Sequence, residues 1–412
     1  MTKNLSTPAI RFKGFTDTWE QRKLGELVDR VVRKNTNNES TLPLTISAQY
    51  GLVDQITYFN NRVASRDVSN YYLVLNGEFA YNKSTSDGYP FGAVKRLDLY
   101  EKGVLSTLYI VFTPKKEQQI DSDFLTVFFD TDRWHKGVAE RAAEGARNHG
   151  LLNISAEDFF DIDLSVPKDI VEQKQIGAFI RQLDNLITLH QRKYDKLTNV
   201  KKSMLEKMFP KNGSNVPEIR FKGFTEAWEQ RKLGECFSER VESMPDGELI
   251  SVTINDGIKK FSELGRHDNS NDNKSKYKKV CVGDIAYNSM RMWQGASGYS
   301  PYEGIVSPAY TVLSPNAGVF SRCIAYQFKL PQMIHTFQIN SQGITSDNWN
   351  LKYPTLSEIE IYISKNVAEQ KQIAEFFTSL DNLITLHQCK RIKMLCFLFI
   401  SYTMQVLQIR CV

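Results

Sequence analysis

The chain has 412 residues, which exceeds one typical folding unit and predicts two globular domains with connecting segments. Hydrophobic residues make up 41% and charged residues 24% of the sequence, a balance that excludes general disorder and fibrous architectures. The formal net charge of +5 fits an anionic partner but is too small to establish one.

The amino-terminal segment has no apolar run of the kind found in signal peptides, and no stretch of about 18 apolar residues occurs in the sequence. We therefore expect a cytoplasmic protein. All six cysteines lie in the second half without a CxxC pair, so the sequence predicts neither a metal site nor a disulfide framework.

The chain repeats itself at both ends of two unlike segments. Residues 10–26, IRFKGFTDTWEQRKLGE, return as residues 219–235 with two differences. A second block, EQKQIGAFIRQLDNLITLHQ from Glu172, returns from Glu369 with 15 of 20 positions identical. The offset is 209 for the first block and 197 for the second. We predict a first globular domain over residues 1–171, a helical spacer over 172–212, a second domain over 213–367 and a distal helix over 368–412.

The segments between the repeated blocks contain short β-like runs separated by polar turns, which predicts mixed α/β domains. Capping-type residues open two helical candidates, although Pro331 interrupts the second. The expected strands are Tyr71–Leu75, Leu108–Phe112, Ile162–Val166, Ala309–Leu313 and Ile359–Ile363, and the expected helices are Asp121–Arg133 and Ser321–Ile334.

In each domain an Ala-Tyr-Asn sequence is followed by a turn-forming segment whose side chains suit the reading of DNA bases. Asn and Gln can bind adenine through two hydrogen bonds, Arg can bind guanine in the same way, and Lys or Ser can hold phosphate. The alternative is a solvated loop in which Asn and Ser bond nearby backbone. The candidates are Tyr81, Asn82, Lys83, Ser84, Thr85 and Ser86 in the first domain, and Tyr287, Asn288, Ser289, Arg291 and Gln294 in the second.

A second polar patch occupies an equivalent late position in each domain and supplies further DNA-binding candidates. These are Arg141, Arg147 and Asn148 in the first domain, and Gln342, Thr345, Asn348 and Asn350 in the second.

From Glu172 to about Met208, apolar residues recur at alternating intervals of four and three, which predicts a long helix with a coiled-coil seam. The distal block returns the same opening register, so the two helices can pair antiparallel and relate the two domains by an approximate two-fold axis. The alternative is an amphipathic helix that folds back on its own domain. The pairing candidates are Ile176, Ile180, Leu183, Ile187 and Leu197 in the first helix, and Ile373, Phe377, Leu380 and Ile384 in the second.

The sequence offers no catalytic centre. It contains no phosphate-binding GxxxxGK[ST] loop, no GxGxxG, no GxSxG, no HExxH, and no tetrapeptide of the kind that amino-methyltransferases use on a flipped base. His190 and His387 fall at matching positions of the helical seam, where packed histidines are expected. Any enzymatic activity would therefore belong to partners.

The whole pattern, with RFKGFTxxWEQRKLGE and EQKQIxxFxxxLDNLITLHQ framing two variable segments, resembles type I restriction-modification specificity subunits of Gram-positive bacteria. The resemblance covers residues 8 to about 388. It implies an α+β fold in which each domain recognises one half of a bipartite double-stranded DNA site and the paired helices set the gap. It also implies docking of two methyltransferase subunits and, through them, restriction subunits, with S-adenosylmethionine, ATP and Mg²⁺ belonging to those partners.

The distal block departs from its first copy after Gln388, where the sequence CKRIKMLCFLFISYTMQVLQIRCV replaces a charged amphipathic continuation. We hypothesise a reading-frame change near Cys389, which a search of the other frames of the coding DNA for an SMLEKMF-like continuation would test. The alternatives to an active specificity subunit are a truncated or silent copy that binds DNA but assembles poorly, and a coiled-coil scaffold that binds only protein.

Overall fold

The structure is a computed structural model that describes residues 8, 10–47, 50–86, 88–142, 150, 152–211, 213–254, 257–265, 267, 268, 270, 273–345 and 348–407, with side chains as far as residue 397. The chain divides into two compact units. Unit 1 contains residues 1–189 and 390–412, and unit 2 contains residues 190–389. Each unit therefore includes part of both long helices, α6 (Ile170–Met208) and α11 (Val367–Leu407).

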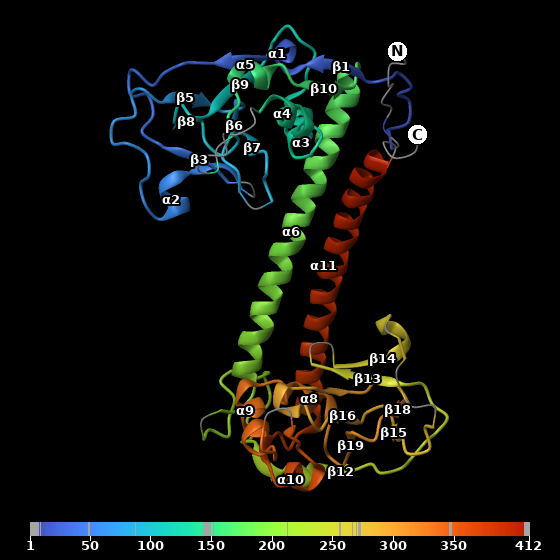
Figure 1. The fold of residues 1–412 in the computed structure, drawn as a ribbon. Coiled ribbons are helices and arrows are strands. Elements are labelled where there is room, and N and C mark those ends of the chain that lie inside the picture. The colour runs from blue at the N-terminus through green and yellow to red at the C-terminus, as the bar shows by residue number, and fades with distance from the viewer. Residues whose placement is uncertain are drawn as a thin grey trace. The chain divides into compact units, whose positions relative to one another are not determined.

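Unit 1 is built around an antiparallel sheet of four strands in the order β2-β9-β6-β7, with the antiparallel pairs β1-β10, β3-β4 and β5-β8 beside it (Figure 1). The elements before α6 are β1 (Glu20–Lys23), α1 (Leu24–Leu27), β2 (Val28–Val31), β3 (Leu44–Ser47), β4 (Gly51–Asp54), α2 (Gln55–Phe59), β5 (Tyr72–Leu75), β6 (Phe79–Asn82), β7 (Ala93–Arg96), β8 (Lys102–Leu105), β9 (Ile110–Pro114), α3 (Ser122–Phe129), α4 (His135–Arg141), α5 (Ala156–Phe160) and β10 (Asp163–Val166).

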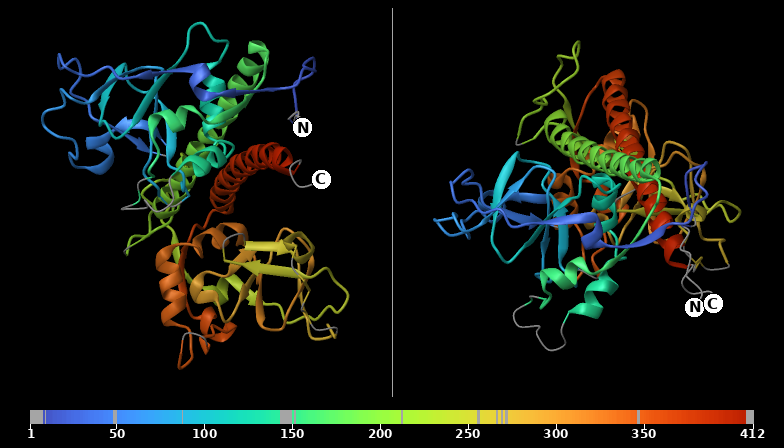
Figure 2. Two further views of the ribbon diagram at one scale, coloured as in Figure 1. Left: turned by 45° about the horizontal axis from the view of Figure 1, so that its top comes forward. Right: turned by 90° about the horizontal axis from the view of Figure 1, so that it is seen from above.

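Unit 2 repeats this topology, with the four-stranded order β12-β19-β16-β17 and the pairs β11-β20, β13-β14 and β15-β18. In the left view of Figure 2 its orange helices lie on one side of the yellow β13-β14 hairpin. The elements between α6 and α11 are β11 (Glu229–Lys232), α7 (Leu233–Cys236), β12 (Phe237–Glu239), β13 (Ile250–Thr253), β14 (Gly257–Lys260), η1 (Phe261–Leu264), β15 (Lys278–Val280), β16 (Ile285–Asn288), η2 (Met292–Gln294), β17 (Ser297–Tyr299), β18 (Gly304–Val306), β19 (Tyr310–Pro315), α8 (Ser321–Gln327), α9 (Pro331–Ile339), α10 (Tyr353–Ser357) and β20 (Glu360–Ile363).

The first repeated block tethers the start of each domain to its end. Its Glu-Gln-Arg-Lys sequence forms β1 in unit 1 and β11 in unit 2. β1 pairs with β10 immediately before α6, and β11 pairs with β20 immediately before α11. The strand pair therefore closes each domain beside the point where its long helix begins.

The second repeated block fixes each long helix to its own domain. In unit 1 the Gln173 side chain donates to Pro167 O (2.8 Å) and accepts from Asp121 N (2.8 Å). In unit 2 Gln370 donates to Ser364 O (2.8 Å) and accepts from Phe320 N (2.7 Å). Since buried amides need partners, these glutamines join the helix start to two other segments of the domain.

A buried ion pair supports the same junction in both units. The Arg11 guanidinium binds both carboxylate oxygens of Glu172, at 2.6 and 2.7 Å, and Arg220 binds Glu369 at 2.5 and 2.8 Å. Both glutamate side chains are fully buried. Hydrogen bonding to the carboxylates raises the pKa of Arg11 and of Arg220 above the ordinary value of an arginine. The two repeated blocks thus meet in the fold, which accounts for their joint recurrence.

The expected helices were partly wrong in extent. The Asp121 side chain accepts a hydrogen bond from Phe124 N (2.9 Å) and caps α3, but α3 ends at Phe129 instead of continuing to Arg133. In unit 2 the expected single helix is two, because α8 ends at Gln327 and α9 begins at Pro331. Proline lacks a backbone N–H and its φ angle suits a first helical turn, so Pro331 starts a helix and does not merely interrupt one.

Within unit 2 the end of α6 packs against the start of α11. The two helices are antiparallel, since residues further along α6 contact residues nearer the start of α11. The Nδ1 atoms of His190 and His387 lie 2.8 Å apart, and Lys201 pairs with Asp381 at 2.5 Å. A shared apolar cluster contains Leu197, Met204 and Met208 of α6 and Ile373, Phe377 and Leu380 of α11. Of the other predicted pairing residues, Ile384 of unit 2 is half-buried, and Leu183 and Ile187 are half-buried in the part of α6 that belongs to unit 1.

The first helix also packs on its own domain near its start. Ile176 packs against the core of unit 1, and Ile180 lines a cavity there. At this end the fold follows the alternative in which an amphipathic helix packs on its own domain. Across the described residues, no helix is long and apolar enough to cross a membrane, and no group of His, Cys, Asp and Glu is placed to hold a metal ion.

Candidate nucleic-acid interface

The first candidate segment of unit 2 is a tight turn that follows strand β16. The Asn288 side chain accepts from Met290 N (3.0 Å), and Arg291 N donates to Asn288 O (2.9 Å). The chain then enters η2, where the Arg291 guanidinium donates to the Gln294 side chain at 3.3 Å. Arg291 is exposed and Gln294 is half-buried, so the turn presents a guanidinium beside an amide.

The second candidate segment of unit 2 is a hairpin in which Gln342 and Asn350 exchange backbone hydrogen bonds of 3.1 and 2.9 Å. At its described tip, Gln342, Ile344, Thr345 and Asn348 are exposed. Asn348 N donates to Thr345 O (2.9 Å), which keeps these two side chains close together.

The fold brings these two segments of unit 2 together, although about 50 residues separate them in the sequence. Leu351 N donates to Ser289 O (2.9 Å), and the Trp293 and Trp349 rings meet edge to face with centroids 5.3 Å apart. The exposed side chains of the turn and of the hairpin therefore lie on neighbouring segments. We call the set Met290, Arg291, Gln294, Gln342, Ile344, Thr345 and Asn348 the unit 2 reading surface.

Lys329 stabilises the end of the turn, since its Nζ donates hydrogen bonds to Gly295 O (2.6 Å) and Ile254 O (3.1 Å). Burial, with a smaller effect of the neighbouring Lys201, lowers the pKa of Lys329 from 10.5 to about 8. The turn carrying Arg291 therefore rests on an amine that loses its proton within the mildly alkaline range.

We predict that the contribution of Lys329 to stability increases as the pH rises from 8 towards 10.5. In that range the unfolded amine holds a proton that the folded amine has lost, so raising the pH favours the folded state. The measurement is urea unfolding of the native chain and of a Lys329→Met variant at each pH. As the pH rises, the free energy of unfolding of the native chain should increase relative to that of the variant. A difference that stays constant with pH would contradict this prediction.

In unit 1 the segment after β6 is held in the same way. The Asn82 side chain accepts from Ser84 N (3.0 Å), and Leu152 N donates to Lys83 O (3.0 Å), the counterpart of the bond from Leu351 to Ser289. Thr85 N donates to Gly150 O (2.6 Å). Ser84 and Ser86 are exposed, whereas Lys83 is half-buried and its Nζ donates to Ile154 O at 3.3 Å.

The second candidate patch of unit 1 is only partly described. Arg147 and Asn148 lie outside the described residues. Arg141 binds Asp161 at 2.9 Å and also donates to the Asp161 carbonyl (2.8 Å). Hydrogen bonds from Lys23 and Arg141 hold the pKa of the Asp161 carboxyl below its ordinary value. The guanidinium of Arg141 is thus engaged within its own domain, which favours a structural role.

The burial of three residues contradicts their expected contact with DNA. Tyr81 and Tyr287 are fully buried in strands β6 and β16, and burial raises the pKa of both hydroxyl groups. Tyr81 stacks on Phe159 and donates to Phe91 O (2.9 Å). Ser289 is 6% exposed and bonds Thr311. Because these side chains face the core, they cannot touch a ligand on the surface.

The structure also adds exposed apolar side chains that sequence reasoning missed. Ile344 is 99% exposed at the hairpin tip, Met290 is 46% exposed in the turn, and Tyr89 is 38% exposed opposite Ser86 in unit 1. Such groups suit contact with thymine methyl groups or with sugars. The signal available in the sequence was an apolar residue inside a short turn-forming segment.

Comparison with known proteins assigns both halves of the chain to one family. Residues 16–199 and 225–395 each match the family described as "Type I restriction modification DNA specificity domain", and these matches cover most of the chain. No curated protein sequence matches the chain significantly.

One of the solved structures similar to this chain shares its fold with a TM-score above 0.5. The type I restriction-modification S subunit from M. genitalium is 14% identical, with a TM-score of 0.52 and coverage of 97% of this chain and 98% of that chain. The HsdS subunit from Thermoanaerobacter tengcongensis is 13% identical, with a TM-score of 0.41 and coverage of 94% and 95%. On the family match over both halves, the chain belongs to the type I restriction-modification DNA specificity family, with one specificity domain in each half.

Proposed function

We propose that each unit reads one half of a bipartite double-stranded DNA target, as the sequence resemblance implies. The observation that carries this proposal is the meeting of two separate polar segments on one surface of unit 2, joined through Ser289 and Leu351. Base recognition needs several directed donors and acceptors in a fixed relation, which one solvated loop does not provide.

Within the unit 2 reading surface, the proposed roles follow from side-chain chemistry. Arg291 is the candidate for guanine, because its planar fork can donate to O6 and N7 together. Gln294, Gln342 and Asn348 suit adenine, and Thr345 with Ile344 suits a thymine methyl group or the backbone. In unit 1 the corresponding candidates are Asn82, Lys83, Ser84, Thr85 and Ser86, with Tyr89 added by the structure.

The two long helices are proposed to set the gap between the half-sites and to dock two methyltransferase subunits, with restriction subunits joining through them. The antiparallel packing of α6 on α11 within unit 2 supports a rigid spacer. We propose that this chain is noncatalytic and acts in the cytoplasm, and that S-adenosylmethionine, ATP and Mg²⁺ are used by the partner subunits. The family match in both halves favours this function over that of a scaffold which binds only protein.

We predict that Arg291→Ala abolishes or relaxes recognition of one half-site and leaves the other unchanged. Loss of one bidentate base contact costs about 1–3 kcal/mol, or roughly 5- to 150-fold in discrimination. The measurement is co-expression with cognate methyltransferase and restriction subunits, followed by mapping of modified adenines in genomic DNA.

Lys232→Ala is the matched control, because Lys232 is also an exposed cation of unit 2. It lies on β11, and its Nζ pairs with Glu358. It should leave the pattern of modified sites unchanged. Equal loss of specificity at both half-sites in Arg291→Ala would show that the arginine has another role. A complete absence of sequence-dependent modification with the native chain would count against the proposed function itself.

A further inference from the structure

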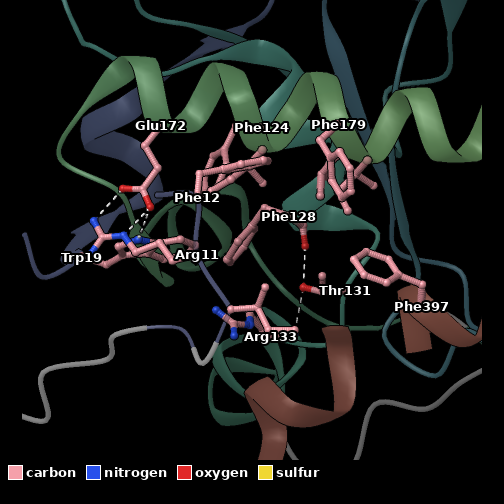
Figure 3. A pocket seen from close by; sticks show the side chains of 14 residues that line it. Arg11, Phe12, Trp19, Phe124, Phe128, Thr131, Arg133, Glu172, Phe179 and Phe397 are labelled. Carbon is pink, nitrogen blue, oxygen red and sulfur yellow. Dashed lines mark hydrogen bonds and ion pairs between the residues drawn. The ribbon is translucent and has the colours of Figure 1, made fainter. Parts of the chain in front are cut away.

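Unit 1 contains an apolar cavity of about 210 Å³ beside the start of α6 (Figure 3). Its walls include Phe12, Trp19, Phe124, Phe128 and Phe179, and the buried pair Arg11–Glu172 closes one side. From α11, Phe397 reaches the cavity and meets the edge of Phe179 with ring centroids 6.1 Å apart. A cavity of roughly 150 Å³ with such walls is large enough to bind benzene.

The repeat identifies the counterpart of this cavity in unit 2. Phe12 and Trp19 correspond to Phe221 and Trp228 at the offset of 209, and Phe179 and Ile180 correspond to Phe376 and Phe377 at the offset of 197. The edge-to-face pair of Phe12 with Phe179 recurs as Phe221 with Phe376. Both sites therefore share three aromatic residues of the frame, whereas the fourth position is Phe377 in unit 2 and Ile180 in unit 1.

In unit 2 this frame holds the end of α6. Phe209 stacks on Phe377 with ring centroids 6.2 Å apart, and it meets Trp228 edge to face at 5.9 Å. Met208, Phe209 and Trp228 are 3%, 1% and 3% exposed. By contrast, Trp19 in unit 1 is only partly buried. A Met-Phe helix end thus fills in unit 2 the place that is a cavity in unit 1.

The distal helix of this chain does not repeat that ending. At the offset of 197 the positions of Met208 and Phe209 correspond to Gln405 and Val406. An amide and a valine cannot supply the stacked phenyl ring that this aromatic frame receives in unit 2, since both are smaller and one is polar.

We propose that the cavity of unit 1 is a docking site for a Met-Phe helix end supplied by a second polypeptide of the same family, one that keeps a Leu-Glu-Lys-Met-Phe-Pro ending. The chemistry of the occupant is given by residues 205–210 of this chain, which fill the equivalent frame. The inference goes beyond DNA reading and does not depend on it, because the cavity involves none of the proposed base-contacting residues.

The test is binding of a fluorescent peptide with the sequence of residues 197–211 to the full chain. We expect saturable one-to-one binding. A peptide in which the counterparts of Met208 and Phe209 are alanine should bind at least about tenfold more weakly, because most of its buried apolar area is lost. Absence of saturable binding at about 100 µM peptide would overturn the proposal.

A chimera that joins residues 1–388 to residues 192–211 is the matched control, because it supplies the helix end within the same chain. The chimera should no longer bind the peptide, since its own Met-Phe ending fills the cavity. Unchanged peptide binding by the chimera would contradict the proposed site.

Photo-crosslinking locates the bound peptide without relying on any variant of the protein. With a benzophenone side chain in place of the peptide's phenylalanine, crosslinks should fall on residues 10–19 or 176–180 of unit 1. Crosslinks on residues 219–228 or 373–377 would mean that the peptide had displaced the end of α6 in unit 2, and the proposal would fail.

Discussion

Replacement of Arg220 by alanine is expected to lower the free energy of unfolding by about 3–5 kcal/mol, because it leaves a fully buried carboxylate without its cation. Glu369 would keep the bond from the Ser364 hydroxyl (2.5 Å) but lose both contacts with the guanidinium. Urea unfolding of the full chain measures the loss, and hydrogen exchange should place it in β11, β20 and the start of α11.

Two variants provide the controls for Arg220→Ala. Arg11→Ala removes the equivalent partner of Glu172, so the loss of protection should move to β1, β10 and the start of α6. The double variant Arg220→Met with Glu369→Gln removes both charges, and it should be more stable than Arg220→Ala alone. A double variant that is less stable than the single variant would show that the uncompensated charge is not the cause.

Replacement of Phe209 by alanine is expected to cost about 3–5 kcal/mol, the usual range for truncating a buried phenylalanine. The variant removes the ring that stacks on Phe377 and covers Trp228, so water should reach the indole. Urea unfolding measures the loss of stability. The tryptophan emission of the folded variant should shift to the red. Absence of this shift when Trp228 is also changed to phenylalanine would place the structural change at Trp228.

Phe397→Ala is the matched control for Phe209→Ala, because Phe397 meets the related aromatic frame of unit 1 but is 45% exposed. Its truncation removes much less buried area and should cost less than about 1 kcal/mol. Equal losses for the two variants would mean that the frames of the two units are filled alike, against the difference inferred above.

The two expected helices show where local signals were sufficient and where they were not. The capping role of Asp121 and the long apolar register of α6 were visible in the sequence, because both depend on residues within a few positions of each other. The break between α8 and α9 was only partly visible, since Pro331 indicated an interruption but not that a second helix begins there.

The candidate site divides in the same way. The turn after Ala-Tyr-Asn and the late polar patch were identifiable from residue types, but Tyr81, Tyr287 and Ser289 were wrongly expected at the surface. Side chains of successive residues in a strand point to opposite faces of the sheet, and this can be read from the sequence. Which of the two faces is buried depends on the elements that pack against the sheet. In unit 1 those covering residues are Trp134 and Phe159, which come more than 50 residues after Tyr81.

The amino-acid sequence by itself determined the duplicated plan, the long helices, the family and the segments in which to look for base contacts, because repeats and periodicity are properties of the order of residues. The tertiary structure alone decided that the turn and the hairpin of unit 2 share one surface and that Arg11 and Arg220 neutralise buried glutamates. It also decided that the repeated aromatic frame is filled in unit 2 but borders a cavity in unit 1. Most of these features depend on contacts between residues about 50 to 220 positions apart, which no local pattern specifies.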